Sequence, residues 1–252
     1  GNFIETVETA PVALENKRID VRQPGAGQRI WKSSGSGSWL RPANWYYWNI
    51  PDTENETAVF GTAAREPAKV RIAGGHRLKG MRFMNRHGYK IVGSGELEMH
   101  ADKGKAFVEV FRGRHRVGVN VKLASDTECL VEDDAELDLG KCLELNGSSL
   151  CVRGGGKVVF GGEFMMSGGS LVLEGAGSVV FAKNAKIKPD GVFVFGRSEN
   201  FEPRAGAEYK LIEGVENLTE EFEKVDMPVL CEDMKWDVSR FYTEGIVRVA
   251  ER

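Results

Sequence analysis

The sequence is poor in cysteine, histidine and proline, and it has neither a long apolar run nor a surplus of one charge. Four cysteines and four histidines occur in 252 residues, without a CxxC, HxH or HExxH pattern. We therefore expect no disulfide framework, no metal site and no bound cofactor. No stretch approaches the roughly 18 consecutive apolar residues of a membrane-spanning helix. With 34 basic and 37 acidic residues, nucleic acid is not an expected partner.

Recognisable catalytic motifs are also missing. The sequence contains no GxSxG, no P-loop and no cysteine–histidine nucleophile pattern, so no catalytic residue is singled out. The four histidines, His76, His87, His100 and His115, are expected to be ordinary surface or turn residues. The first ten residues have neither the charged nor the apolar region of a signal peptide, so an export signal is not expected within this chain.

Glycine is abundant by contrast, with 31 residues, and it punctuates an internal repeat. The segment SLCVRGGGKVVFG (149–161) recurs as SLVLEGAGSVVFA (170–182), an offset of 21 residues, and weaker copies lie at 129–140 and 192–196. Apolar residues alternate with other residues within each copy, as in a strand with one buried face. A unit this short cannot bury its apolar face alone, so successive units are expected to stack.

Three short strands fit in each 21-residue unit, which predicts an all-β, single-stranded, three-sided parallel β-helix. Further strands are expected upstream, at 69–72, 80–83, 89–92, 95–99, 107–111 and 117–123. The inward residues expected in the first unit are Cys129, Val131, Leu137, Leu139, Leu143 and Leu145, with counterparts 21 and 42 residues later. The same register places Cys151 outward and Cys142 at a turn on another side, so these two thiols and that of Cys129 should be unpaired.

One column breaks the alternation of inward and outward residues. Its members recur at intervals of 21 residues and are apolar although they are expected to point outward: Leu130, Cys151, Val172 and Phe193. Exposed apolar stripes are usually covered, and we expect the C-terminal segment (201–252) to cover this flank, with self-association or an external partner as the alternative. The single domain then consists of an N-terminal segment with an aromatic cap (1–60), the β-helix repeats (61–200) and the C-terminal segment.

Aromatic residues concentrate in GSGSWLRPANWYYWNIPD (35–52), directly before the first rungs. A solenoid exposes its core and unpaired backbone at each end, so a cap there prevents end-to-end association. The tryptophans placed to form this cap are Trp31, Trp39, Trp45 and Trp48. The alternative is a platform on which sugar rings stack, for which the candidates are Tyr46, Tyr47 and Trp48.

A basic run, FRGRHR (111–116), precedes one of the expected strands. Its arginines, Arg112, Arg114 and Arg116, are candidates for contact with an acidic polysaccharide, although charged runs usually just face water. Together with the aromatic candidates, they make a cell-surface or extracellular glycan the partner to consider.

Short motifs resemble those of a known family. These motifs are Trp31, GSGSW (35–39), NW (44–45), Pro51 and AVF (58–60), the rungs GSGELEM and GGGKVVFGG, and YKLIEG…W…YTEGIVRV (209–249). In them the chain resembles secreted bacterial proteins built from autotransporter-associated β-strand repeats. The resemblance implies a right-handed β-helix, export, and an extracellular or cell-surface role, and it carries no catalytic residues. The leading hypothesis is an exported structural, adhesive or passenger-type surface module without catalytic activity. The alternative is a polysaccharide-binding or polysaccharide-cleaving β-helix protein.

Overall fold

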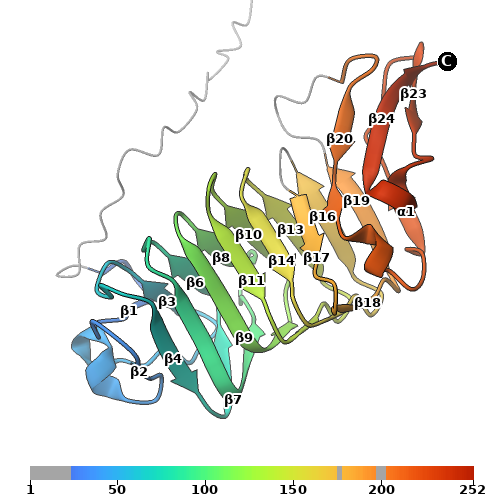
Figure 1. Cartoon of the computed structure of the whole chain (residues 1–252). Coiled ribbons are helices and arrows are strands. Elements are labelled where there is room, and N and C mark those ends of the chain that lie inside the picture. Colours follow the sequence, from blue (N-terminus) through green and yellow to red (C-terminus); the bar gives the residue numbers. More distant parts are fainter. Residues whose placement is uncertain (1–23, 175–177, 197–202) are drawn as a thin grey trace, which may run out of the picture.

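The computed structural model describes residues 24–174, 178–196 and 203–252, and it shows a β-solenoid of about 6 turns (Figure 1). The predicted parallel β-helix is confirmed. The coils lie side by side along one axis, with the N-terminal cap at one end and a small antiparallel sheet at the other. Parts of the three predicted regions, namely 1–23, 175–177 and 197–202, lie outside the described residues, and the boundaries of the regions stay predictions.

One side of the solenoid is a nine-stranded sheet in which the strands of successive coils pair in parallel, extended at its two ends by strands of the cap and of the last partial coil. Its strands, in order, are β1 (Gln28–Ile30), β3 (Thr57–Phe60), β6 (Gly80–Phe83), β8 (Ala106–Val110), β10 (Thr127–Val131), β13 (Ser149–Arg153), β16 (Ser170–Glu174), β19 (Val192–Gly196) and β22 (Lys224–Asp226).

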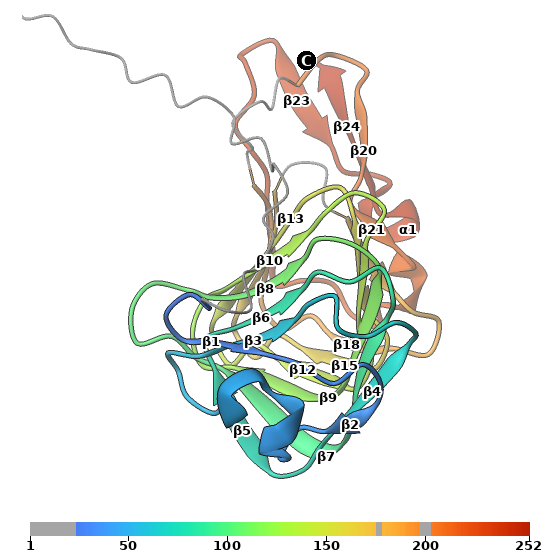
Figure 2. The same cartoon turned by 90° about the vertical axis from the view of Figure 1, so that its left-hand side faces the viewer.

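A twelve-stranded sheet forms the other two sides, because the long strands β7 (Tyr89–Met99) and β9 (Arg114–Leu123) run from one side onto the other (Figure 2). The second side adds β2 (Gly37–Ser38), β4 (Ala68–Ile72), β11 (Glu136–Leu139), β14 (Lys157–Phe160), β17 (Ser178–Phe181) and β21 (Ile212–Glu213). The third side adds β5 (Gly75–Leu78), β12 (Cys142–Glu144), β15 (Glu163–Met165) and β18 (Lys186–Lys188).

The core runs through the centre of the coils, and every predicted inward residue from Cys129 to Ile187 is buried. Matching side chains stack on one another, as Leu150 does beside Leu171 and Val158 beside Val179. Glycine makes the tight corners between the sides. Gly154 has a φ of 91°, and a Cβ there would lie 2.1 Å from the carbonyl oxygen of Val131, so no other residue fits this corner without strain.

The predicted outward position of Phe193 is wrong. Phe193 lies beside Leu171 and is fully buried, whereas Val194 lies beside Val172. The turn after β17 has two residues more than the turn after β14, and the turn after β18 has one residue fewer than the turn after β15. The net shift of one residue reverses inside and outside, because side chains alternate along a strand.

The predicted apolar stripe is correspondingly shorter. Cys151 lies beside Glu128 on one neighbouring coil and beside Val172 on the other, whereas Leu130 lies beside Glu109 and Arg153. The stripe therefore consists of Cys151, Val172 and Val194, with charged residues at its N-terminal end.

The C-terminal residues close the end of the solenoid. Strands β21 and β22 add a last partial coil, with the 3-10 turn η3 (Val215–Asn217) between them. The chain also forms an antiparallel sheet of β20 (Glu208–Lys210), β24 (Ile246–Glu251) and β23 (Met234–Asp237), and a short helix, α1 (Phe241–Glu244). Phe241 packs on the core-facing Phe193 with ring centroids 5.1 Å apart, and Trp236 packs on Phe195. These two aromatic contacts cover the C-terminal end of the core at Phe193 and Phe195, and they do not involve the apolar stripe.

All four cysteines are free thiols. Cys129 points inward and is 1 % exposed, as predicted. Cys142 begins β12 on a different side of the solenoid and is half-buried. Cys151 is on the outer face of β13 but is nevertheless buried, where its interactions include those with Arg153 and Glu174.

Candidate functional site

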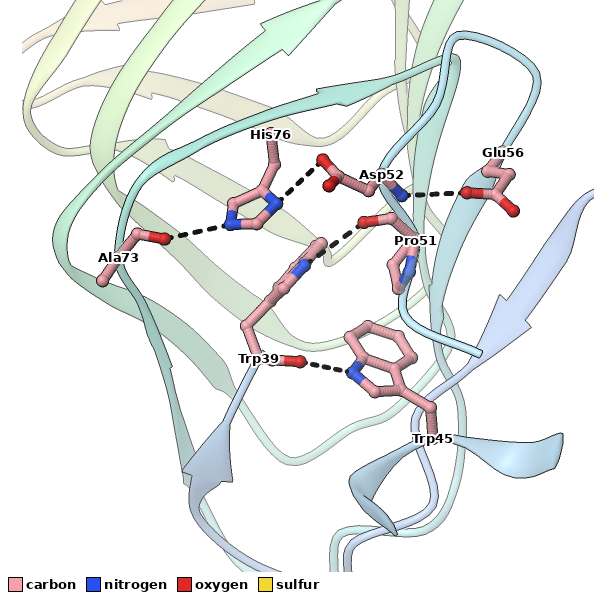
Figure 3. Close-up of polar contacts among 7 residues, drawn as sticks. All are labelled: Trp39, Trp45, Pro51, Asp52, Glu56, Ala73 and His76. Atoms are coloured by element: carbon pink, nitrogen blue, oxygen red, sulfur yellow. Dashed lines mark hydrogen bonds and ion pairs between the residues drawn. The ribbon is translucent and has the colours of Figure 1, made fainter. Parts of the chain in front are cut away.

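The N-terminal cap is an aromatic cluster laid across the first coil. Trp31, Trp39 and Trp45 are fully buried, with edge-to-face ring pairs at 5.1 and 5.0 Å. The indole nitrogen of Trp45 donates to the carbonyl of Trp39 (2.8 Å), and that of Trp39 donates to the carbonyl of Pro51 (3.3 Å; Figure 3). Phe60 of β3 contacts all three rings. The predicted aromatic cap is confirmed for these three tryptophans.

Trp48, the fourth predicted cap tryptophan, points away from the core. It ends the 3-10 turn η2 (Tyr46–Trp48), which follows η1 (Pro42–Asn44). Trp48 is 66 % exposed and Tyr47 is 55 % exposed, while Tyr46 is half-buried. The ammonium group of Lys32 lies 5.8 Å from the centre of the Trp48 ring. Two of the three predicted sugar-stacking residues therefore present their side chains to solvent.

The backbone that carries these two rings is strained. Tyr47 has a φ of 58° and Trp48 a φ of 60°. Both lie in the left-handed region, where residues other than glycine, asparagine and aspartate are uncommon. Such a conformation persists only where the surrounding structure imposes it, and it is found most often at functional sites. Here the buried Trp45, the residue before η2, anchors the turn that carries Tyr47 and Trp48.

A pocket of about 340 Å³ lies beside the cap, between the loop after η2 and the third side of the solenoid. Its lining residues are mostly charged: Asp52, Glu54, Gly75, His76, Arg77, Glu96 and Glu98. His76 is only 7 % exposed and packs against Trp39. Its Nδ1 lies 2.9 Å from Asp52 Oδ1, and its Nε2 lies 3.0 Å from the carbonyl oxygen of Ala73 (Figure 3).

The hydrogen-bonding groups of this pocket are mostly engaged with one another. Both ring nitrogens of His76 lie within hydrogen-bond distance of an oxygen of the protein itself, so neither is free for a ligand. Arg77 pairs with Glu98 (2.8 Å), and Lys122 pairs with Glu96 (3.2 Å). The arrangement fixes the loop at Asp52 to β5, and it is better suited to holding a polar ligand than to transferring protons.

Sequence reasoning missed this pocket and misplaced two histidines. His76 and His115 were expected at the surface or in turns, yet both are buried. No local pattern marks His76, because its partner Asp52 lies 24 residues away. The signal that was available is positional: His76 and His115 each occupy an inward place in an alternating strand.

The basic run 111–116 lies at the start of β9, separated from the cap's β2 by β4 and β7, so it forms a surface of its own. Arg112, Arg114 and Arg116 are exposed. Arg116 pairs with Asp138 at 2.6 Å, and Arg114 lies 3.9 Å from Glu136.

His115, between these arginines, is part of the core. Its Nδ1 accepts a hydrogen bond from the backbone N–H of Tyr89 (3.0 Å), and its Nε2 donates to the carbonyls of Arg112 and Asn85. Burial is the largest cause of the lowered pKa of His115, so the ring is neutral in its place beside Phe83.

Comparisons with protein families, with characterised proteins and with solved structures find no match. The β-solenoid therefore stands on the structure alone, and the resemblance to autotransporter-associated repeats stays a hypothesis. Among the described residues, no group of three or more histidine, cysteine and acidic side chains is placed to hold a metal ion. In the same part of the chain, no helix has the length and apolar character needed to cross a membrane.

Proposed function

We propose that the protein is an exported, non-catalytic adhesive module, in which a rigid β-solenoid presents a carbohydrate-binding surface on its N-terminal cap. The observation that carries the proposal is the pair of exposed rings at Tyr47 and Trp48, held out in a strained backbone conformation. Aromatic rings offer flat apolar faces to the C–H faces of sugars and lose little entropy on binding.

The rest of the surface supports a structural role for the coils. Charged side chains pair across neighbouring rungs on all three sides, for example Arg82 with Glu109 (2.5 Å), Arg116 with Asp138 and Arg77 with Glu98. Pairs of this kind stabilise an exposed sheet modestly and leave it nearly neutral. Both ends of the core are also covered, which suits a module that stays separate from its copies.

Export and a cell-surface or extracellular location rest on the sequence resemblance, and the state of the thiols is compatible with them. Burial raises the pKa of Cys129 to about 12 and also raises the pKa of Cys151. Thiols that stay protonated react slowly with oxidants, so these two can persist unpaired outside the cell.

A polysaccharide-cleaving function is the second candidate, because the carboxylate-rich pocket lies next to the cap. Cleavage by paired carboxylates needs one group kept as an acid and another free to attack or activate water. Glu98 and Glu96 are each neutralised by a cation, and His76 is occupied on both sides. These pairings favour binding over cleavage.

Affinity electrophoresis against a panel of neutral and acidic polysaccharides tests the proposal, with reducing-end release measured on the same polymers. We expect retardation by at least one polymer, no release of reducing ends, and loss of retardation in the Tyr47→Ala/Trp48→Ala variant. The matched control is Val229→Ala, which removes another highly exposed apolar side chain (87 %) from the other end of the molecule. Binding that survives in Tyr47→Ala/Trp48→Ala overturns the role of the cap, and release of reducing ends overturns the non-catalytic assignment.

A further inference from the structure

A strip of basic side chains crosses neighbouring rungs on the second side of the solenoid, next to the cap. The backbone register places Lys69 of β4 beside Lys90 of β7, and Lys90 beside Arg116 of β9. Arg71 lies two positions along β4 from Lys69, and Arg114 two positions along β9 from Arg116, on the same outer face. All five side chains are exposed.

We call these five residues the basic strip: Lys69, Arg71, Lys90, Arg114 and Arg116. The strip differs from a charged column on another side of the solenoid. On the third side, by contrast, an outward column alternates in sign, with Arg77, Glu98, Lys122 and Glu144 side by side on β5, β7, β9 and β12. Within the part of the chain that the structure describes, Lys69, Arg71 and Lys90 form no salt bridge to a carboxylate. Acidic partners begin only at the next rung, with Glu136 and Asp138 on β11.

From this arrangement we infer that the basic strip binds a linear acidic polysaccharide with a carboxylate on each sugar, laid along the solenoid axis. Strands in a sheet are roughly 4.8 Å apart, so Lys69 and Lys90, continued by Arg116, which already pairs with Asp138, form a row of cations at a spacing close to the length of one sugar unit in a chain. A polymer with one carboxylate per sugar can then meet one cation per rung. Lys69, Arg71 and Lys90 lie close together without a salt bridge and repel each other, and a bound polyanion relieves this repulsion.

Nucleic acid fits the strip less well. Proteins that bind it by charge generally carry a basic excess over a whole domain, whereas this chain has a net charge of −3. The strip is narrow, because Glu136 and Asp138 bound it on one side. The inference rests on the adhesive function proposed above and adds a second surface with its own ligand class.

The test measures binding of full-length protein to polygalacturonate, to a neutral glucan and to single-stranded poly(dT), at low and at physiological salt. The double variant Lys69→Glu/Lys90→Glu is compared with Lys183→Glu/Lys188→Glu, which makes the same charge change at exposed lysines in and beside β18. We expect polygalacturonate binding that weakens with salt, drops about tenfold or more in Lys69→Glu/Lys90→Glu, and is retained in the control. Unfolding midpoints of both variants are measured alongside.

The outcomes separate the two proposals. Binding of a neutral glycan only, lost on removing Tyr47 and Trp48, keeps the adhesive function and overturns the basic strip. Equal losses in the two lysine variants, or poly(dT) bound as tightly as polygalacturonate, also overturn the strip as a polysaccharide site. If no polymer binds under any condition, both proposals fail.

Discussion

Replacing Phe241 with alanine should destabilise the protein strongly, because this ring closes the C-terminal end of the core. Phe241 is 1 % exposed and opens the short helix α1, which is followed by Gly245 in a left-handed conformation (φ 67°). Its ring contacts those of Phe193 and Phe222 at 5.1 and 6.2 Å between centroids. Removing it takes away one of the two rings that pack on Phe193, the other being Phe222 at 5.2 Å, and opens a cavity at the last full coil.

The size of the effect follows from this burial. A buried phenylalanine replaced by alanine costs about 3–5 kcal/mol, the sum of lost transfer free energy and the cavity left behind. A typical domain has a free energy of unfolding of about 5–15 kcal/mol, so Phe241→Ala should lose a large share of it. The helix itself should not suffer, because alanine has the highest helix propensity.

Urea unfolding followed by tryptophan fluorescence gives the free energy, and light scattering reports whether the opened end associates. The control is Val229→Ala, which is 87 % exposed in the wild-type chain and should change stability by less than about 0.5 kcal/mol. A loss of unfolding free energy below about 1 kcal/mol in Phe241→Ala would refute the end-cap reasoning, because removal of a fully buried phenylalanine ring costs more than this.

Three further predictions concern strain, thiols and pH. Trp48→Gly should be more stable than Trp48→Ala by about 0.5–1 kcal/mol in thermal unfolding, because only glycine occupies a φ of 60° without strain; equal stabilities would show that the backbone relaxes. At pH 8 a thiol reagent should modify Cys231 promptly, since it is the exposed cysteine. Modification of all four cysteines should require denaturation, because burial raises the pKa of Cys129 to about 12. A second cysteine that reacts rapidly in the folded protein would contradict this. Finally, burial lowers the pKa of His115 below its ordinary value of 6.5, so the unfolded chain takes up the proton first as pH falls. Stability from the neutral ring is complete above about pH 6.5 and is lost as pH falls towards the lowered folded value. His115→Gln should flatten this part of the pH–stability curve, and a curve as steep as that of the wild-type chain would contradict the assignment to His115.

Much of the fold is predictable from the sequence because stacking makes the repeat visible. Each coil must place apolar residues at the same stations to fill a continuous core, so Leu150 and Leu171, or Phe160 and Phe181, occupy equivalent places in the chain and in space. Two coils of equal length are enough to reveal this period. The cap is predictable for a related reason, since a stack of coils must begin somewhere and tryptophan covers a large area there.

The exact register was not predictable where turns change length. β10 pairs with β13 at an offset of 23 residues (Cys129 with Val152), and β16 pairs with β19 at an offset of 22 (Leu171 with Phe193). The first offset is two residues longer than the 21-residue period, and an even shift keeps side chains on the same face, so the inward prediction for Cys129 was right. The second offset is one residue longer than the period, which moves side chains to the opposite face, so the outward prediction for Phe193 was wrong.

The candidate sites were only partly predictable for a physical reason that applies to any solenoid. The nearest neighbours of an outward side chain lie one coil away in sequence, so a functional cluster is spread across the chain at intervals close to the repeat. The run FRGRHR looked like a compact basic cluster, yet it includes the buried His115. Lys69 and Lys90, the lysines that lie in register with Arg116, come from two earlier coils. The charge that a ligand would meet is therefore read from the register of the strands, and a short run of sequence letters underestimates it.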